Sequence, residues 1–567
     1  MNSSILFFDA TTKLINPQDE FFIGKNTREL IINEDALIDE VLTTIINNNL
    51  LEEEYTNIIL PACFGAILSN FIGLRLATQI RCTPGVNQTS NIFLYSFTGI
   101  QDYFNNECFN ILKTTGVSLV DYDIQTILNC FNKQQRFLKS NNLKQQVSNL
   151  KLDVPLNYAD SHSVANEWAI YRWSNALNTS DDQILKIETK LENDLYFKYL
   201  KAINPVNELE EINLKELKLN FSGDPKVLYI DDEAEKGWWE IFCKILDDEN
   251  EISFSHLDDE FNQKNQNEII DISLNKVIIE KIDIVILDLR LHKEDFNNKP
   301  IDEITGFKIL EKIKNHNKGI QVIIFSATNK IWNLQALQNA GADGFIIKES
   351  PNNNYETGFT KKSIEKMLLK VDECLDMIFL KDVYNHMKRV KKHLQNVSNN
   401  TGEYGLEEGL VKMKFKNEIS IQLDIIYDCL SRTSINISSD IKDENSYLNL
   451  SFISIFKIIE LINDYFTDET GNRLKSNSKN IQRYNHQTRQ FVKIAKDKYP
   501  TTKDKISSII HFELNTTLDT YTNKLNKFIN VRNNIIHPKT LKDYKKTSKQ
   551  DNVSFLSLLS DLIMNVR

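Results

Sequence analysis

The chain has 567 residues, a formal net charge of −11 and 41% hydrophobic residues. This length exceeds what one hydrophobic core supports, so about two to four folded domains are expected, and the composition excludes an intrinsically disordered chain. The start of the chain lacks the basic residues of a secretory signal, and no uncharged apolar run reaches the roughly 18 residues of a membrane span. The seven cysteines are scattered without metal-ligand spacing, which favours reduced thiols. We therefore expect a cytoplasmic protein with no membrane association.

Short apolar strands alternate with helical patterns over residues 1–123. Strands are predicted at Ser4–Ala10, Thr56–Pro61, Asn91–Thr98 and Gly116–Asp121, and a helix is predicted at Ile72–Arg81. This alternation is typical of an α/β domain with a parallel sheet. Residues 124–220 are charged and helical in pattern, so we expect a helical connector there.

Four apolar strands follow in the central part of the chain. They cover Lys226–Glu233, Ile282–Leu291, Gln321–Thr328 and Gly341–Lys348, and helical patterns such as Gly306–Lys314 and Ile331–Ala340 lie between them. Strands that are apolar throughout and alternate with helices predict a parallel sheet covered on both faces. Ligands bind such sheets at the carboxyl ends of the strands. The polar residues at these ends are Asp231, Asp232, Asp288, Ser326 and Lys348.

The order of these residues resembles the receiver domain of response regulators in two-component phosphorelay systems, and we assign it to residues 221–352. The motifs are the acidic pair in Y-I-D-D-E, then D-L-R-L, then S-A-T, then G-A-D-G-F-I-I-K. The resemblance implies a phosphoprotein with Asp288 as the phosphoacceptor. It also implies that Ser326 and Lys348 contact the phosphoryl oxygens, and that Phe345 is the aromatic residue that reorients on switching.

A divalent cation is expected beside the acceptor. The resemblance implies an Mg²⁺ site formed by Asp231, Asp232, the Asp288 carboxylate and the backbone carbonyl of Arg290. The residue types suit this chemistry, because converging carboxylates repel one another until a hard cation neutralises them. The alternative is that these acids only cap loops of a flavodoxin-like fold. The long segment Leu291–Thr305 departs from the family's pattern and is expected to form a lid or a partner surface.

The N-terminal pattern repeats that of the receiver-like segment. Gly73 aligns with Gly306 and Ser96 aligns with Ser326, whereas the acceptor position carries Pro61. At the remaining positions, the first acid of the pair is kept as Asp9, the second is replaced by Ala10, and the lysine is replaced by Asp121. This internal duplication predicts a degenerate receiver-like domain over residues 1–123, which cannot take a phosphoryl group and serves as a docking or dimerisation module.

The pattern becomes helical throughout beyond residue 352. We expect a helical connector over residues 353–445 and a helical bundle over residues 446–567. The predicted helices are Lys361–Leu394, Asp424–Leu430, Leu448–Phe466, Arg489–Lys496, Lys505–Leu514 and Thr517–Ile536. The complete prediction is therefore α/β plus all-α, with flavodoxin-like parallel-sheet receiver domains followed by a C-terminal helical bundle.

A basic segment lies within the predicted bundle. Ten lysines and arginines against two acids occur between Gly471 and Lys505, with aromatic residues among them. Such a segment suits a phosphate backbone, and a solvated helix face is the alternative. The residues expected to bind RNA are Arg473, Lys475, Lys479, Arg483, Arg489 and Lys493.

The stretch R-N-N-I-I-H-P near the C-terminus carries a second candidate site. A helical bundle ending in this motif resembles the HEPN superfamily, whose ribonuclease members carry an arginine, a short spacer and a histidine. The resemblance implies metal-independent catalysis by Arg532, Asn533 and His537, at a site shared across a homodimer or higher homo-oligomer, with Glu460 as a candidate upstream polar residue. Histidine suits the base that takes the 2′-hydroxyl proton, and arginine suits the cation that stabilises the phosphorane. The alternative is that these basic groups only occupy an exposed helix end.

Two functions remain open from the sequence. The first is a receiver-regulated signalling effector whose C-terminal domain is an endoribonuclease, with a toxin-like or antiphage defence role. The second is a non-enzymatic response-regulator adaptor whose helical domain mediates oligomerisation or partner binding. A third, a bundle modified by a nucleotidyltransferase partner, is disfavoured because Lys539 stands where such proteins carry a tyrosine. The expected partners are an upstream histidine kinase or another regulatory protein, RNA, and further copies of the chain.

Overall fold

The computed structural model of the chain describes residues 3–9, 15–16, 18–32, 38–65, 70–154, 161–204, 212–296, 299–327, 331–350, 358–399, 406–433, 444–485, 487–495, 497–514, 519–536 and 547–565. These residues belong to two compact units. The first comprises Met1–Lys218, Glu233–Asn250 and Ile347–Glu365, and the second comprises Leu219–Asp232, Glu251–Ile346 and Lys366–Arg567.

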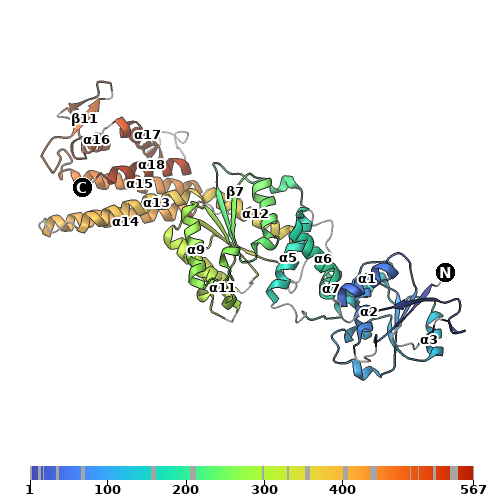
Figure 1. The fold of residues 1–567 in the computed structure, drawn as a ribbon. Helices are drawn as coiled ribbons and strands as arrows, with labels where there is room; N and C mark the ends of the chain where they lie inside the picture. The colour runs from blue at the N-terminus through green and yellow to red at the C-terminus, as the bar shows by residue number, and fades with distance from the viewer. Residues whose placement is uncertain are drawn as a thin grey trace. The chain divides into compact units, whose positions relative to one another are not determined.

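The first unit contains a parallel five-stranded sheet. Its strands are β1 (Ser4–Asp9), β2 (Asn26–Leu30), β3 (Asn57–Pro61), β4 (Asn91–Ser96) and β5 (Val117–Asp121), in the order β2-β1-β3-β4-β5. The strands β1, β3 and β4 are buried along their whole length, because helices cover both faces. The helices are α1 (Ile38–Leu50), α2 (Ile72–Cys82) and α3 (Ile124–Phe131) (Figure 1). This sheet confirms the predicted parallel α/β fold.

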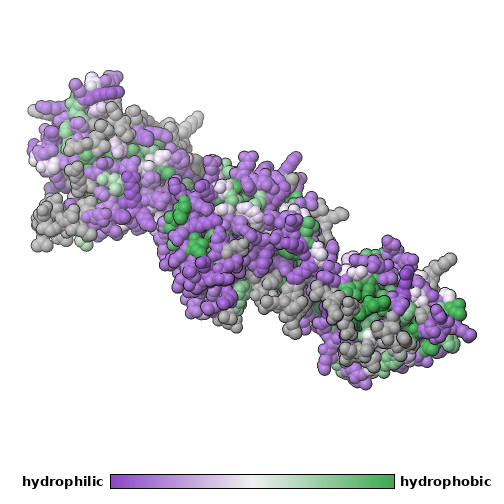
Figure 2. Space-filling view, in the orientation of Figure 1, coloured by the Kyte–Doolittle hydropathy of each residue, from purple (hydrophilic) through white to green (hydrophobic). Residues whose placement is uncertain are grey.

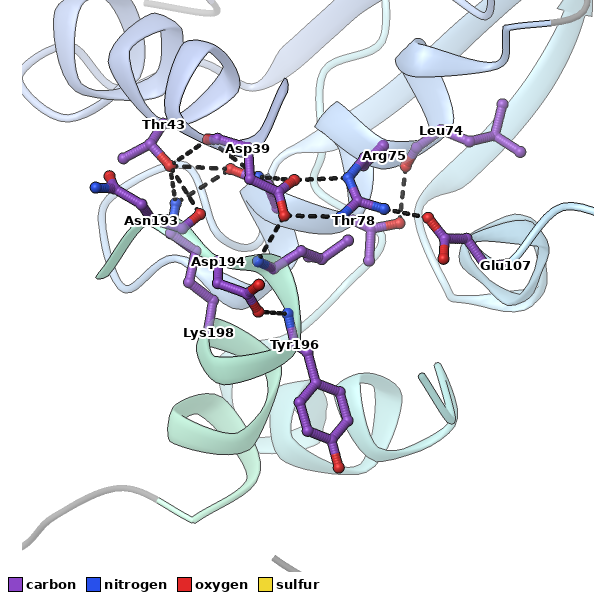
Figure 3. Close-up of polar contacts among 12 residues, drawn as sticks. Asp39, Thr43, Leu74, Arg75, Thr78, Glu107, Asn193, Asp194, Tyr196 and Lys198 are labelled. Carbon is purple, nitrogen blue, oxygen red and sulfur yellow. Dashed lines mark hydrogen bonds and ion pairs between the residues drawn. The ribbon is translucent and has the colours of Figure 1, made fainter. Parts of the chain in front are cut away.

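Four further helices of the same unit lie within residues 124–220, for which a helical connector is predicted. They are α4 (Leu143–Ser148), α5 (Ser161–Leu177), α6 (Asp182–Asn193) and α7 (Leu195–Ile203). A cluster of buried polar groups joins α7 to α1 and α2 (Figure 3). Lys198 donates to Thr43 at 2.7 Å and to Gln79 at 3.1 Å, while Asp39 accepts two hydrogen bonds from Arg75 and one from the Leu195 amide. The connector is therefore fixed to the sheet domain by specific polar contacts.

Aromatic packing joins α5 to residues 233–250. Trp173 lies 5.4 Å from Trp238 between ring centroids, at the start of α8 (Trp238–Cys243). Gly237 has a φ of 128°, and a Cβ there would lie 2.9 Å from an Ile170 methyl. Glycine therefore allows both the backbone conformation and the close approach of α5.

The second unit contains the other five-stranded sheet. Its strands are β6 (Lys226–Ile230), β7 (Ser253–Leu257), β8 (Ile284–Leu287), β9 (Gln321–Ser326) and β10 (Gly344–Ile347), in the order β10-β9-β8-β6-β7. The helices that follow its strands are α9 (Gln266–Ile279), α10 (Thr305–His316), α11 (Ile331–Asn339) and α12 (Phe359–Met377). Numbered from its own first strand, each sheet has the order 2-1-3-4-5, which is the flavodoxin-like topology. The predicted fold class is confirmed for both sheets.

A helical region follows and shares one hydrophobic core. Its helices are α13 (Phe379–Asn399), α14 (Leu406–Ser431), α15 (Glu444–Phe466), α16 (Thr502–Phe512), α17 (Asp519–Ile536) and α18 (Lys549–Ile563). The core runs from Met377 to Ile563 and includes the stacked rings of Phe528 and Phe555. Hydrophilic residues cover most of the visible surface of this region, whereas hydrophobic patches are visible on the N-terminal sheet domain (Figure 2). The predicted C-terminal helical region is thereby confirmed.

Two predictions for this region are wrong. The predicted single helix at Lys361–Leu394 is two helices, because the helix breaks at Ile378. The break brings the first turn of α13 onto Gly319, where a Cβ would lie 2.2 Å from the Leu380 carbonyl carbon.

The predicted helix at Arg489–Lys496 is instead part of an antiparallel hairpin. It consists of β11 (Gln482–Asn485) and β12 (Gln490–Lys493). Phe491 packs against Tyr484, His511 and Phe512, with ring centroids 4.8 to 5.2 Å apart. This packing fixes one strand face, and tertiary contacts override a weak helical pattern in so short a segment.

None of the helices that the structure describes is long and apolar enough to cross a membrane.

Candidate functional site

The carboxyl ends of β6 and β8 bring three predicted acids together. Ile230 pairs with Leu287 in the register of these strands, so Asp231 and Asp288, the next residues, also lie opposite each other. The Asp288 amide donates to the Ile230 carbonyl at 2.9 Å. One oxygen from each of Asp231, Asp232 and Asp288 lies within 4.8 Å of the others, and Asp231 and Asp288 are fully buried. The strand register therefore creates the acidic cluster.

The chemistry of this donor set fits a hard divalent cation. Three carboxylates at this separation repel one another, and oxygen atoms are the ligands that Mg²⁺ prefers. Tyr229 on β6 donates its hydroxyl hydrogen to Asp231 Oδ2 at 2.5 Å. Burial and the nearby Asp231 carboxylate raise the pKa of Tyr229 well above its usual value. The tyrosine is therefore protonated at neutral pH and acts as a donor.

Three further predicted site residues lie on β9 and β10 of the same sheet or shortly after β8. Ser326 ends β9 and is buried, while Phe345 lies on β10 and packs at the edge of the sheet's hydrophobic core. Arg290 follows Asp288 by two residues, and its guanidinium carbon lies 5.6 Å from the centroid of the Phe296 ring. The Arg290 side chain thus packs against the loop that follows β8. The predicted cation ligand is its backbone carbonyl, which this contact does not involve.

Lys348 directly follows β10 and is 2% exposed. Its ammonium lies 5.7 Å from the centroid of the Trp238 ring. The next residue, Glu349, accepts a hydrogen bond from Thr360 at 2.9 Å and lies 3.8 Å from Arg172 on α5, with the side chains of Arg172 and Glu349 at most 2% exposed. The connector helix therefore contacts the residue that follows the predicted phosphoryl-binding lysine.

The helix α5 also contacts the residue that follows the acidic pair. Asn166 donates to Glu233 at 2.5 Å and accepts a hydrogen bond from the Trp238 indole at 2.6 Å. Asn166 and Glu233 are both buried. The helix α5 thus contacts the residues that directly follow Asp232 and Lys348. The sequence did not indicate these contacts.

The predicted insertion Leu291–Thr305 is organised around one carboxylate. Asp295 is buried and accepts hydrogen bonds from the amides of Leu291, His292 and Thr305 at 3.0 to 3.2 Å. The described part of this segment forms two short 3₁₀ turns, Lys293–Phe296 and Ile301–Glu303. It is therefore a structured loop after β8.

Backbone contacts align the N-terminal sheet with the second sheet residue by residue. A Cβ on Gly73 would lie 1.9 Å from the Pro61 carbonyl oxygen, and a Cβ on Gly306 would lie 2.3 Å from the Asp288 carbonyl oxygen. Pro61 therefore stands at the position of Asp288. The last pair in the register of β1 and β3 is Leu6 with Ile59. Two residues further along both strands, Phe8 lies opposite Pro61.

The predicted alignment of the N-terminal acid is wrong by one residue. Phe8, not Asp9, occupies the position of Asp231, and Asp9 matches Asp232. Apolar strands of similar length can be aligned with a shift of one residue, and the backbone register decides between the alignments. Ala10 lies outside the described residues.

In the N-terminal sheet, internal contacts occupy the region that corresponds to the acidic cluster. Pro61 has no N–H for the Phe7 carbonyl, which accepts instead from the Tyr95 hydroxyl at 3.1 Å. The Ser96 hydroxyl is hydrogen-bonded to the Tyr103 hydroxyl, and Asp9 accepts from the Gly65 amide at 2.6 Å. Among the described residues of this sheet there is no group of three acids that could hold a cation.

The second predicted site is described only in part. Arg532 lies on α17, with one guanidinium nitrogen 3.6 Å from Glu460 on α15 and another donating to Asn533 at 3.2 Å. Its guanidinium carbon lies 4.9 Å from the centroid of the Phe456 ring. The structure thus brings Arg532, Asn533 and Glu460 together, whereas His537 lies outside the described residues.

Several of the basic residues predicted to bind RNA have partners within the chain. Arg483 forms an ion pair with Asp504 at 3.1 Å, and Lys475 donates to two backbone carbonyls at the end of α15. The Lys479 ammonium lies 4.3 Å from the centroid of the Phe512 ring. Arg473 forms an isolated β-bridge just before the hairpin. Arg489 lies in the turn of the hairpin, and Lys493 ends its second strand. Much of this positive charge therefore supports the fold of the hairpin.

Comparison with known families agrees with the two sheets. Residues 10–120 match the inactive receiver domain, and residues 270–357 match the response regulator receiver domain. No curated protein matches the chain. The receiver domains support a role in response-regulator signalling. A receiver domain implies a partner that donates the phosphoryl group, such as a kinase, and conventionally uses Mg²⁺. Neither family match extends beyond residue 357 into the helical region.

Proposed function

We propose that the chain is a phosphorylation-controlled signalling protein in which Asp288 accepts the phosphoryl group. The convergence of Asp231, Asp232 and Asp288 within 4.8 Å carries this proposal. An Asp288 oxygen attacks the phosphorus of the donor, and the bond from phosphorus to the donor breaks with its electron pair leaving on the donor. Asp231, Asp232, the Asp288 carboxylate and the Arg290 carbonyl would hold Mg²⁺, which would shield the negative charge of the phosphoryl group. The Lys348 ammonium and the Ser326 hydroxyl would contact the phosphoryl oxygens.

The N-terminal sheet serves as a docking or dimerisation module in this proposal. Phe8 and Pro61 replace two of the three acids, so this copy lacks the means to bind a cation or to form an acyl phosphate. Its sheet nevertheless keeps the same strand order. A fold that is kept without its chemistry is best explained by a surface that a partner or a second copy recognises.

We propose an endoribonuclease as the output of the helical domain, with Arg532, Asn533 and His537 as its catalytic residues. The contact of Arg532 with Glu460 and Asn533 supports it, because a composite site needs its arginine held in a fixed orientation. His537 would take the 2′-hydroxyl proton, and Arg532 would stabilise the negative charge on the phosphorane. The hairpin residues Arg489 and Lys493 would bind the RNA backbone.

The second candidate function is a non-enzymatic adaptor, and a specific observation favours it. Arg483 is held by Asp504, and Lys475 donates to two backbone carbonyls at the end of α15. Cations that are neutralised within the fold have less charge to offer to RNA. In this alternative the helical domain only oligomerises or binds a partner protein.

RNA integrity in cells that express variants of the full chain distinguishes the two functions. The endoribonuclease predicts RNA degradation that is lost in Arg532→Ala and in His537→Ala, and that changes in Asp288→Ala. Lys527→Ala, a basic residue on the exposed side of the same helix α17, is the matched control and should behave as the parent. Equal degradation by the parent and by both site variants would leave the adaptor as the function.

A further inference from the structure

One polar contact at the acidic cluster comes from a residue to which the receiver resemblance assigns no role. Tyr229 is the last but one residue of β6 and is fully buried. Its hydroxyl lies 2.5 Å from Asp231 Oδ2, and its ring centroid lies 6.4 Å from that of Phe325, the residue before Ser326. Since side chains alternate along a strand, Tyr229 and Asp231 project from the same face of the sheet.

We propose that Tyr229 is a positioning residue for the cation site, and that its hydroxyl orients the Asp231 carboxylate toward the cation. This inference rests on the phosphoacceptor function proposed above. A carboxylate has a broad rotational freedom about its last side-chain bond, and that freedom is lost when it binds a metal. A hydrogen bond to Oδ2 restricts this rotation before the cation arrives. Groups that hydrogen-bond to metal ligands generally act in this way.

The hydroxyl also acts on the charge of the cluster. A donor on Asp231 Oδ2 withdraws negative charge from a group that lies within 4.8 Å of two other carboxylates. The cluster is thereby kept together before the cation binds. A phenylalanine at position 229 would pack in the same space and would supply neither effect.

The N-terminal sheet provides an independent observation. Phe8 occupies the position of Asp231 there, so the residue two places earlier, Leu6, occupies the position of Tyr229. The copy that lacks the carboxylate also lacks the hydroxyl. A buried hydroxyl without an acceptor is costly, so it is expected only where it has a group to hold. The pairing of hydroxyl with carboxylate in one copy, and the absence of both from the other, indicate that the Tyr229 hydroxyl serves Asp231.

Calorimetric titration of Mg²⁺ into the full chain tests the inference. Tyr229→Phe should raise the dissociation constant for Mg²⁺ by about tenfold. This is the lower end of the usual effect of removing a group that holds a metal ligand. The Mg²⁺ concentration that gives half the maximal rate of phosphorylation by acetyl phosphate should rise by a similar factor. Tyr95→Phe is the matched control, because it removes a buried hydroxyl from the equivalent region of the N-terminal sheet, and its Mg²⁺ affinity should equal that of the parent.

The outcomes separate this inference from the function on which it rests. If the parent binds Mg²⁺ and Tyr229→Phe binds it equally well, the positioning role is wrong and the phosphoacceptor site stands. An equal loss in Tyr229→Phe and Tyr95→Phe would also overturn the inference, because it would indicate general destabilisation. A parent chain that binds no Mg²⁺ would overturn both proposals. If Tyr229→Phe does not fold, Tyr229→Leu takes its place with the same expected loss, since the N-terminal sheet folds with leucine at this position.

Discussion

Asp288 is fully buried beside Asp231 and Asp232, a position that is unfavourable for three negative charges. Their mutual repulsion raises the energy of the folded state until a cation is bound. The same repulsion makes the site selective for a divalent cation, which gains from each of the three ligands. Function and instability therefore have the same origin at this position.

Replacement of Asp288 by asparagine should stabilise the receiver in the absence of Mg²⁺. Removal of one charge from the cluster is expected to raise the free energy of unfolding by about 1 to 3 kcal/mol. Added Mg²⁺ should then stabilise the parent and have a much smaller effect on Asp288→Asn, as measured by urea unfolding with and without the cation. The exposed acid Asp302 supplies the control, Asp302→Asn. Equal stabilisation of parent and Asp288→Asn by Mg²⁺ would contradict the assignment.

Lys198 is a buried lysine that gives the N-terminal unit a dependence on pH. Burial lowers its pKa from 10.5 to about 8, and the nearby Asp39 carboxylate opposes this effect only in part. Cys82, Lys201 and Glu192 are the other titratable groups that act on it. Because the pKa in the folded state is below that of the unfolded state, the protonated lysine destabilises the fold. That penalty is fully present below about pH 8 and is relieved as the pH rises toward 10.5.

Replacement of Lys198 by methionine should remove this dependence. The stability of Lys198→Met relative to the parent is expected to be greatest below pH 8 and to fall by about 3 kcal/mol as the pH rises from about 8 to 10.5. Urea unfolding of both chains at several pH values measures the difference, in which the titration of the common cysteines and tyrosines largely cancels. A difference that is constant across this range would show that Lys198 titrates normally in the folded chain.

At the scale of elements, α5 (Ser161–Leu177) is held by two buried polar contacts. Asn166 donates to Glu233, and Arg172 forms an ion pair with Glu349. These acceptors immediately follow Asp232 and Lys348 in the chain. The helix α5 therefore contacts the residue that follows each of these two predicted site residues.

Removal of the buried cation from this pair should destabilise the first unit strongly. Arg172→Met leaves the Glu349 carboxylate buried without its arginine, and the expected loss is about 3 to 5 kcal/mol. The control is Lys190→Met, because the Lys190–Glu167 pair has a lysine side chain that is 43% exposed and is worth only about 0.5 kcal/mol. Adding Glu349→Gln to Arg172→Met should recover part of the stability, as measured by urea unfolding. Similar small losses in both methionine variants would contradict the role of burial.

The elements differ in how far the sequence could predict them. The strands β6, β8 and β9 could be found from their uniform apolar composition, because they are buried on both faces. The hairpin β11–β12 could not, since its strands are short and take their conformation from the packing of Phe491 against α16. The break at Ile378 was also hidden, because the apolar periodicity continues across it while the close approach to Gly319 comes from a distant part of the chain.

The site shows the same division. Asp231 and Asp288 could be expected to meet, because parallel strands end at one edge of the sheet. The match of Phe8, rather than Asp9, to Asp231 needed the hydrogen-bond register, which sequence periodicity does not provide. The alternation in K-V-L-Y-I-D-D places Tyr229 on the same side of the sheet as Asp231, but no sequence motif indicates the hydrogen bond between them.

At the scale of the whole molecule, one topology occurs twice with different chemistry. Both sheets have the strand order 2-1-3-4-5, and the packing of Gly73 and Gly306 on the acceptor position is the same. The difference lies in a few side chains at the strand ends, where phenylalanine and proline replace two acids. This division predicts that phosphorylation chemistry belongs to one half of the pair and recognition to the other.

Intact-protein mass spectrometry after incubation with acetyl phosphate and Mg²⁺ tests the central claim most directly. The parent chain should gain the mass of one phosphoryl group, and the gain should require Mg²⁺. Asp288→Ala should gain none, whereas Asp9→Ala, in the N-terminal copy, should gain one as the parent does. Phosphorylation of Asp288→Ala at the level of the parent, or a parent chain that stays unmodified with Mg²⁺ and donor in excess, would contradict the assignment of Asp288 as the phosphoacceptor.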